Sequence, residues 1–256
     1  MILQGHVLMQ KIVVITPTHN AQNALSHLAV QLASQDIPGL EWLIVDDHST
    51  DGTADYIESL SGQYDHKIHL VRHTGPRGQA AAFCVGFQQA IDRGADIIVQ
   101  MNVGAHQPQY LAQMLDLLNR GHFDMVIGAR YADSTAKGQP WPRKALSSLV
   151  RASAPVILNM PINDPASSFR VWRVTALQDV DFNRVQTKGE AFMVELAYRA
   201  HRLGYRIGEV PVYVTHHHDN QTNNALAQEA ASHLWMRLRY RGLTPSRRKS
   251  WGIKPI

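Results

Sequence analysis

The sequence predicts one α/β domain built on a mostly parallel β-sheet. Over the first 130 residues, short β-branched runs alternate with longer segments of helical apolar periodicity. The 256 residues, 45% hydrophobic and 18% charged, suffice for one domain with a substantial core. No run of 18 apolar residues and no signal peptide is recognisable, so we expect a cytoplasmic protein.

Strands and helices are expected to alternate along the first half of the chain. The expected strands are 11–16, 41–45, 68–71, 96–101 and 125–129, and the helices between them are 21–34, 53–61, 79–93 and 108–120. An open sheet of this kind binds its ligands beyond the carboxyl ends of the strands. The segments in that position are 16–20, 46–51, 72–78, 102–106 and the chain from 130 onward.

The second half has a less regular pattern. We expect a helix over 141–158, interrupted by Pro155, a helix over 189–203, a strand over 206–215 and an amphipathic helix over 225–240. The tract around His216, His217 and His218 is expected to be a loop. These patterns predict an α/β domain over 8–224, followed by a C-terminal amphipathic helix and basic tail over 225–256.

Positive charge is concentrated at the C-terminus. The formal charge of the chain is +4, and the segment 237–254 holds seven arginine or lysine residues and no acidic one. The rest of the chain is therefore acidic and shows no nucleic-acid-binding motif, so nucleic acid is excluded as a partner. A basic tail that also carries Trp235, Leu238 and Trp251 suits an anionic membrane surface or a protein partner, and a solvated extension is the alternative.

The single cysteine is predicted to be structural. Cys84 cannot form an internal disulfide, and it lies in an apolar helical run over 80–87. An activated thiol needs a partly exposed, electropositive setting, so we expect a small core residue here and not a nucleophile.

Two common nucleotide-binding classes are excluded by the first strand and its turn. The turn after this strand, Pro17-Thr18-His19-Asn20, lacks the glycines with which a dinucleotide-binding fold approaches pyrophosphate. The sequence also has no phosphate-binding loop of the Gly-x-x-x-x-Gly-Lys-Ser/Thr type.

Two carboxylates follow the second expected strand. Asp46 and Asp47 end a buried run, and the chain then turns at 49–53 into a helix for which Thr50 or Asp51 is a suitable N-cap. Local capping of amides would explain these aspartates alone. However, Pro17-Thr18-His19-Asn20 followed by Val45-Asp46-Asp47-x-Ser49-x-Asp51-Gly52-Thr53 resembles the nucleotide-binding motif of family 2 glycosyltransferases of the GT-A fold.

The resemblance extends in order over about 11–215. The matching segments are Gln100-Met101, His106-Gln107-Pro108, Val126-Ile127-Gly128-Ala129-Arg130-Tyr131, Trp141-Pro142-Arg143, Asp164-Pro165-Ala166-Ser167-Ser168-Phe169-Arg170, Gly189-Glu190-x-Phe192-Met193-Val194-Glu195-Leu196 and 204–212. They are similar to the polyprenol-phosphate mannosyltransferases. The resemblance implies a Rossmann-like GT-A domain, a GDP- or UDP-linked hexose donor, mannose or glucose as the hexose, a lipid-phosphate acceptor, inversion at the sugar carbon and attachment at the inner membrane surface.

The resemblance also implies site residues. A phosphate acceptor is already an anion, so the reaction needs positive charge and positioning and no general base. By comparison with the family, Pro17, Asn20 and Asp47 contact the nucleoside with Asp46 beside them, Arg130 and Arg143 lie at the phosphates, Ser147 lies on the acceptor side and Asp164 lines the cleft.

The sequence departs from the family at its metal motif. Family members hold Mg²⁺ or Mn²⁺ with an Asp-x-Asp motif, but this chain has Asn102-Val103-Gly104 and one deletion there. Asn102 offers a neutral carbonyl, a weak ligand for a hard cation, so we expect it at the donor without a metal and assign no metal ligand. A basic loop near the phosphates is also replaced by the tract 216–224, with its three histidines, and the family's Ser-Gly-Phe-Arg is Ser167-Ser168-Phe169-Arg170.

Three interpretations of these departures stay open. In the first, Arg77, Arg130, Arg143 and the histidines neutralise the diphosphate of a metal-independent transferase. In the second, His216 to His218 recruit a transition metal together with His106 and Asp219, against which a solvated histidine loop is the simpler alternative. In the third, the protein has lost catalysis and binds a nucleotide-sugar or a protein partner.

Overall fold

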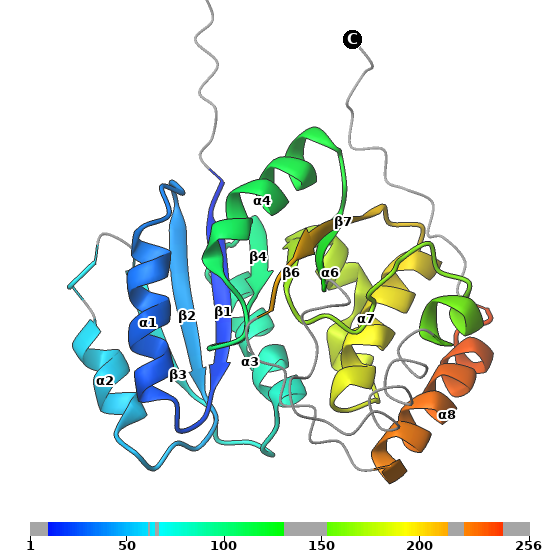
Figure 1. Cartoon of the computed structure of the whole chain (residues 1–256), viewed down its shortest axis with the longest axis horizontal. Helices are drawn as coiled ribbons and strands as arrows, with labels where there is room; N and C mark the ends of the chain where they lie inside the picture. The colour runs from blue at the N-terminus through cyan, green and yellow to red at the C-terminus, as the bar shows by residue number, and fades with distance from the viewer. Residues whose placement is uncertain (1–9, 61, 65–66, 131–152, 215–222, 243–256) are drawn as a thin grey trace, which may run out of the picture.

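The computed structural model describes residues 10–60, 62–64, 67–130, 153–214 and 223–242, and within them it shows a seven-stranded sheet between helical layers (Figure 1). The strands are β1 (Ile12–Thr18), β2 (Leu40–Asp46), β3 (Lys67–Arg72), β4 (Ile97–Gln100), β5 (Met125–Arg130), β6 (Arg170–Arg173) and β7 (Ile207–Val212). Their order across the sheet is β3-β2-β1-β4-β6-β5-β7. This arrangement confirms the predicted α/β class.

Six of the seven strands run in one direction. β1 pairs in parallel with β2 and β4, β2 with β3, and β5 with β7, whereas β6 is antiparallel to both of its neighbours, β4 and β5. The carboxyl ends of the six codirectional strands therefore meet at one edge of the sheet, where an open α/β sheet binds its ligands.

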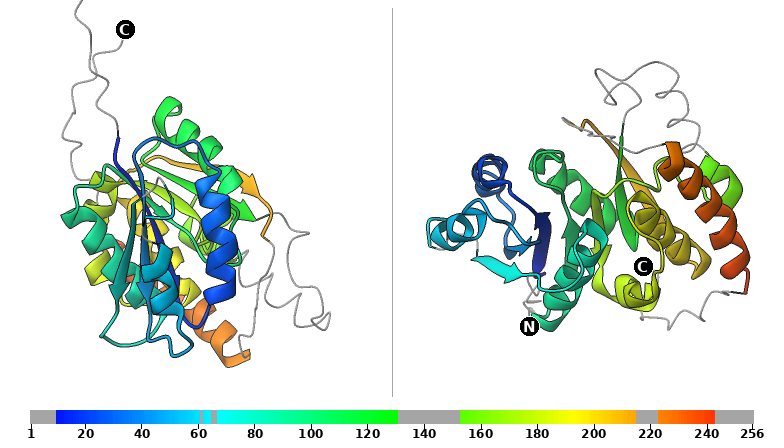
Figure 2. Two further views of the ribbon diagram at one scale, coloured as in Figure 1. Left: turned by 90° about the vertical axis from the view of Figure 1, so that its left-hand side faces the viewer. Right: turned by 90° about the horizontal axis from the view of Figure 1, so that it is seen from below.

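The helices cover both faces of the sheet (Figure 2). They are α1 (Gln22–Ala33), α2 (Thr53–Leu60), α3 (Gln79–Asp92), α4 (Leu111–Arg120), α6 (Val174–Val180), α7 (Glu190–Arg202) and α8 (Asn223–Arg239), with short 3₁₀ turns at Pro108–Tyr110 and Phe182–Arg184. Buried residues of α1, α2 and α4 share one core cluster, and those of α3, α6, α7 and α8 share the other. Each face of the sheet is thus buried, which favours near-continuous apolar strands such as β2.

α3 packs closely on the centre of the sheet because of one glycine. A Cβ atom on Gly86 would lie 2.4 Å from Cγ2 of Ile15 on β1 and 3.2 Å from Cγ2 of Val45 on β2. Any larger residue would push α3 away from the strands, and this helix begins at the loop that carries Arg77 and Gly78.

The predicted elements of the first half are confirmed to within a few residues, except that the last helix opens as a 3₁₀ turn at Pro108. Of the expected helix over 141–158, only 153–158 lies within the described residues, and that part is helical. β6 and α6 were not predicted from the sequence. No helix in the described part of the chain is both long and apolar enough to cross a membrane.

Candidate active site

The loops that follow β1, β2, β3 and β4 are joined by backbone hydrogen bonds at the carboxyl edge of the sheet. The amide of Asp47 donates to the carbonyl of Thr18 (2.8 Å), and the amide of His73 donates to the carbonyl of Asp46 (2.9 Å). The amide of Met101 donates to the carbonyl of Ile15 (3.0 Å). These bonds extend the parallel pairing into the loops, so side chains from separate strands are held at one place.

Asp47 is the centre of a histidine cluster. Its Oδ1 lies 3.0 Å from Nδ1 of His73 and 3.1 Å from Nδ1 of His48, and its Oδ2 accepts the Gly78 amide at 2.8 Å. Burial raises the pKa of Asp47, but the hydrogen bonds from Gly78, His73 and His48 outweigh it, so the pKa lies below its ordinary value. Asp47 is therefore a carboxylate at neutral pH.

Asn20 and Asp46 fix the loop after β2. Asn20, in the left-handed region with φ of 48°, donates its amide to Oγ of Ser49 (2.9 Å) and accepts the Thr50 amide at Oδ1 (2.8 Å). Oδ2 of Asp46 lies 3.4 Å from the Ser49 amide, while its buried Oδ1 has no hydrogen-bond partner among the described residues. That oxygen can accept a donor from a ligand.

The predicted capping role of this loop is also confirmed. Oδ1 of Asp51 accepts the Thr53 amide at 3.1 Å, which satisfies the first amide of α2. Asp46 and Asp51 therefore bond local amides, whereas Asp47 bonds the Gly78 amide, 31 residues away in the chain. Local capping accordingly does not account for Asp47.

Arg77 lies beside the first loop. Its Nη2 is 2.7 Å from Nε2 of His19, and Nδ1 of His19 is 2.9 Å from the carbonyl of Asp47. The Arg77 side chain is exposed. The guanidinium therefore sits at the rim of the Asp47 cluster, on the side open to solvent.

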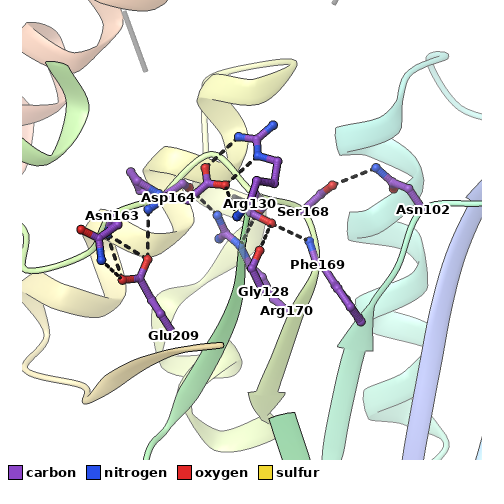
Figure 3. Close-up of polar contacts among 11 residues, drawn as sticks. Asn102, Gly128, Arg130, Asn163, Asp164, Ser168, Phe169, Arg170 and Glu209 are labelled. Carbon is purple, nitrogen blue, oxygen red and sulfur yellow. Dashed lines mark hydrogen bonds and ion pairs between the residues drawn. The ribbon is translucent and has the colours of Figure 1, made fainter. Parts of the chain in front are cut away.

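A second cluster lies at the end of β5 (Figure 3). Nε of Arg130 is 2.6 Å from Oδ2 of Asp164, and Nη2 is 2.7 Å from Oδ1. The Arg130 amide also donates to Oδ2, at 3.0 Å. The two side chains are 6% and 12% exposed, so this is a largely buried bidentate ion pair.

The segment carrying Asp164 is itself held by contacts with β5 and β7. Glu209 of β7 accepts the amides of Asn163 and Asp164, at 2.9 and 3.0 Å (Figure 3). Oγ of Ser167 donates to the carbonyl of Gly128 at 2.7 Å, at a place where a Cβ on Gly128 would meet the ring of Phe169 at 2.9 Å. These contacts set the position of Asp164 and, through it, of the Arg130 guanidinium.

Arg170 is buried beneath this segment. Its Nε donates to the carbonyl of Ser167 (2.7 Å) and its Nη2 to that of Pro165 (2.5 Å). Burial lowers the pKa of Arg170 to about 9, although Asp164 opposes the shift. Arg170 therefore holds the segment 165–167 against the start of β6 by hydrogen bonds, and its buried side chain is not exposed to a ligand.

The end of β4 carries a neutral hydrogen-bonded pair. Nδ2 of Asn102 lies 2.8 Å from Oγ of Ser168 (Figure 3), and the Asn102 amide donates to Nδ1 of His106 at 2.9 Å. The His106 ring stacks on Phe169 with centroids 4.8 Å apart. Asn102 and Ser168, two positions at which the sequence is expected to depart from the family, therefore contact each other.

These residues do not fit a hard divalent cation. Mg²⁺ and Mn²⁺ prefer several charged oxygens, but Asn102 and Ser168 offer neutral groups bonded to one another, and Asp164 is occupied by Arg130. Within the described ranges, the group of His, Cys, Asp and Glu side chains close enough to share an ion is Asp47, His48 and His73. Its mutual hydrogen bonds account for its arrangement.

A cavity of about 340 Å³ lies between the β4 and β5 clusters. It is lined by Pro17, Gln79, Asn102, Val103, Ala105, His106, Arg130, Ala166, Ser167, Ser168, Glu190, Met193 and Val214. Of the predicted site residues, Pro17, Asn102 and Arg130 therefore share this cavity. Asn20, Asp46, Asp47 and Arg77 form the neighbouring cluster at the ends of β1 to β3.

Some predicted residues lie outside the described part of the chain, and the structure adds others. The predicted residues outside the described ranges include Arg143, Ser147 and the histidines 216–218. The residues that the structure adds include His48 and His73 beside Asp47 and Glu190 in the cavity lining, none of which was assigned from the sequence. The position of His73, directly after an expected strand, was the available signal for it.

The chain belongs to glycosyl transferase family 2, whose model matches residues 13–181. It is 32% identical over 208 residues to the polyprenol monophosphomannose synthase of Mycolicibacterium smegmatis, covering 80% of this chain and 78% of the relative. It is 31% identical over 205 residues to the undecaprenyl-phosphate mannosyltransferase of Micrococcus luteus, covering 79% of this chain and 82% of the relative. The predicted family is therefore confirmed.

Solved structures share the fold. Glucosyl-3-phosphoglycerate synthase from Mycobacterium tuberculosis, in complex with Mn²⁺, uridine diphosphate and phosphoglyceric acid, superposes with a TM-score of 0.67 at 16% identity, covering 93% of this chain and 80% of that one. The same enzyme with Mn²⁺ and UDP-glucose gives a TM-score of 0.64 at 14% identity, with 93% and 81% covered. The GT-A fold expected from the sequence is thereby confirmed.

Proposed function

We propose that this protein transfers a hexose, mannose or glucose, from a GDP- or UDP-linked donor to a polyprenyl-phosphate acceptor with inversion at the sugar carbon. The observation that carries the proposal is the similarity to two polyprenyl-phosphate mannosyltransferases along about four fifths of the chain. The cavity at the carboxyl edge of the sheet supports it, because Pro17, Asn102 and Arg130 line one space.

The proposed step needs positive charge and alignment. An oxygen of the acceptor phosphate bonds to the anomeric carbon, and the bond from that carbon to the donor diphosphate breaks. The electron pair leaves with the nucleoside diphosphate, so no proton is removed from the nucleophile and no general base is required. A guanidinium beside the departing phosphate stabilises the developing charge, and Arg130 is held in place for this by Asp164.

The binding roles follow the two clusters. Asp47, Asn20 and Asp46 stand at the ends of β1 and β2, where the nucleoside is proposed to bind, with Arg77 at the rim. Arg143 and Ser147 are proposed at the acceptor phosphate by resemblance. The neutral pair Asn102–Ser168 is proposed to face the donor without a divalent cation, so the transfer is metal-independent.

Titration calorimetry tests the donor half of the proposal. GDP, UDP, GDP-mannose and UDP-glucose are each titrated with Mn²⁺ and again with EDTA. Micromolar binding that persists in EDTA supports the metal-free site and identifies the base. Binding that requires Mn²⁺ would contradict metal independence, and absence of binding to all four would contradict the proposed function.

Transfer to a short polyprenyl phosphate tests the acceptor half. The labelled sugar should move into the lipid fraction with wild-type protein and with Asp116→Ala, a change at an exposed ion pair on α4. Donor binding without any transfer would favour an inactive nucleotide-sugar-binding protein, the alternative that the missing acidic motif supports.

A further inference from the structure

α8 presents an apolar surface to solvent. Leu234, Trp235 and Leu238 are 56%, 36% and 71% exposed on this helix. Val156, 79% exposed, lies in the neighbouring helical segment, which Arg237 joins to α8 by donating to the Ile157 carbonyl. The described part of the chain has six exposed large hydrophobic side chains, and four of them lie on α8 or on this neighbouring segment. We name the surface formed by these four the α8 face: Val156, Leu234, Trp235 and Leu238.

The opposite side of α8 is anchored in the core. His233, Met236 and Tyr240 are buried, and Met236 and Tyr240 belong to the cluster that covers one face of the sheet. The Tyr240 hydroxyl donates to Glu195 of α7, which is fully buried. Burial, with the adjacent Glu195, raises the pKa of Tyr240, so this phenol stays protonated as a donor. The orientation of α8 is therefore fixed, and its apolar face is held outward.

Positive charge lies at the C-terminal end of the α8 face. Arg237, Arg239 and Arg241 are exposed at the end of α8, and the Arg239 guanidinium lies 5.4 Å from the Trp235 ring centroid. From Arg237 to the last residue the sequence contains no acidic side chain. Apolar side chains, a tryptophan and arginines together match the boundary between anionic headgroups and acyl chains.

We propose that the α8 face binds the surface of a bilayer that contains anionic phospholipid, with Leu234, Trp235 and Leu238 in the boundary region and the arginines at the headgroups. The charge of this region distinguishes a lipid surface from a second copy of the chain, because two copies would bring like charges together. The proposal deepens the proposed function and rests on it in one respect, since a polyprenyl-phosphate acceptor lies in such a bilayer. Figure 2 shows α8 along the outer edge of the described part of the molecule.

Vesicle co-sedimentation of the full chain tests the proposal. Wild-type protein should bind phosphatidylglycerol-containing vesicles, and binding should weaken with salt and on pure phosphatidylcholine. The double variant Leu234→Ser/Leu238→Ser should lower the partition coefficient at least about tenfold, since it removes the apolar area of two leucine side chains from the boundary region. The matched control is Val30→Ser on α1, 62% exposed and away from the α8 face, which should bind like wild type.

Two further variants separate the contributions of charge and tryptophan. Arg239→Gln/Arg241→Gln should reduce binding to anionic vesicles and leave the weaker binding to neutral vesicles unchanged. Trp235 should give a blue-shifted emission component on vesicles, which Trp235→Phe removes. Circular dichroism confirms that each variant is folded before its binding is compared.

Three results would overturn the proposal. They are equal binding by the Leu234→Ser/Leu238→Ser variant and wild type, equal binding to neutral and anionic vesicles, and a dimer in sedimentation velocity that the double variant dissociates. Nucleotide titration on the same samples keeps the two proposals distinguishable. Vesicle binding without donor binding would contradict only the proposed function. Donor binding without vesicle binding would contradict only the proposal that the α8 face binds a bilayer.

Discussion

Arg130 and Asp164, 34 residues apart in the chain, form one unit in which the guanidinium and the amide of the arginine both bond the same carboxylate. The family resemblance placed both residues in one cleft but did not predict their pairing. Because Asp164 balances part of the arginine's charge, a bound phosphate competes with that carboxylate. In the proposed function, Asp164 is therefore a positioning residue for the Arg130 guanidinium.

Replacing Asp164 by Asn should destabilise the fold by about 3–5 kcal/mol, the usual cost of removing one partner of a buried ion pair. The amide cannot neutralise the guanidinium, which stays largely buried. Urea unfolding of Asp164→Asn, Arg130→Met and the double variant measures the coupling. The matched control is Asp116→Asn at the exposed Asp116–Arg120 pair, which should change stability by less than about 1 kcal/mol.

Arg130→Ala should weaken binding of a nucleoside diphosphate far more than binding of the nucleoside alone. The reason is that the guanidinium is proposed to contact phosphate, while the nucleoside is proposed to bind at the Asp47 cluster. Calorimetry with guanosine, uridine and their diphosphates measures both quantities. An equal loss for nucleoside and diphosphate would count against this role of Arg130.

Asp47→Ala should abolish selectivity between GDP and UDP in calorimetric titrations, because the change removes the acceptor that holds His73, His48 and the Gly78 amide.

Asp47 also predicts a pH dependence of stability. Its folded pKa is depressed, so its contribution to stability is present above the unfolded pKa of about 3.9 and is lost as pH falls through the folded pKa. Below about pH 4, the variant Asp47→Asn should lose less stability with falling pH than the wild-type protein does. An equal loss of stability in variant and wild type would contradict this role of Asp47.

The alternating half of the fold was predictable because its information is local. β1 and β2 hold apolar runs at 12–15 and 42–45, and α4 carries buried residues at helical spacing. β6 was not predictable in this way, since it has four residues and begins at Arg170, whose burial depends on carbonyls of Ser167 and Pro165. Its antiparallel insertion between β4 and β5 depends on contacts that are distant in the sequence.

The site was predictable to a similar degree. The strand pattern placed 16–20 and 46–51 at the carboxyl edge of the sheet, where the structure has Asn20, Asp46 and Asp47, while their proposed nucleoside contacts come from the family resemblance. The partners of Asp47 were not predictable, because His73 is 26 residues away and periodicity gives no side-chain direction in a loop. The contact between Asn102 and Ser168, 66 residues apart, likewise required the fold.

His233 predicts a second pH effect, in the anchoring of α8. This side chain is fully buried, and burial lowers its pKa to about 4. The unfolded chain therefore binds a proton on this histidine below about pH 6.5 while the folded chain does not, so stability falls as pH drops from 6.5 towards 4. Between pH 6.5 and 5 the loss from this group should be about 2 kcal/mol.

Urea unfolding at several pH values tests His233. The variant His233→Leu should flatten the curve between pH 6.5 and 5, and the exposed α1 variant His27→Gln should leave it unchanged. A wild-type slope retained in His233→Leu would assign the pH effect to another group.

Cys84 should be inert in the folded protein. It packs against the core on α3, and burial raises the pKa of its thiol to about 11. At pH 8 only about one molecule in a thousand then carries the reactive thiolate, against roughly a quarter for an ordinary cysteine. A disulfide reagent such as dithionitrobenzoate should therefore modify the native protein more than a hundredfold more slowly than the unfolded chain. Below the urea concentration of global unfolding, the modification rate should rise with urea only if α3 opens locally. Rapid stoichiometric modification of the native protein would show that the thiol is accessible and activated, contrary to the core role predicted from the sequence.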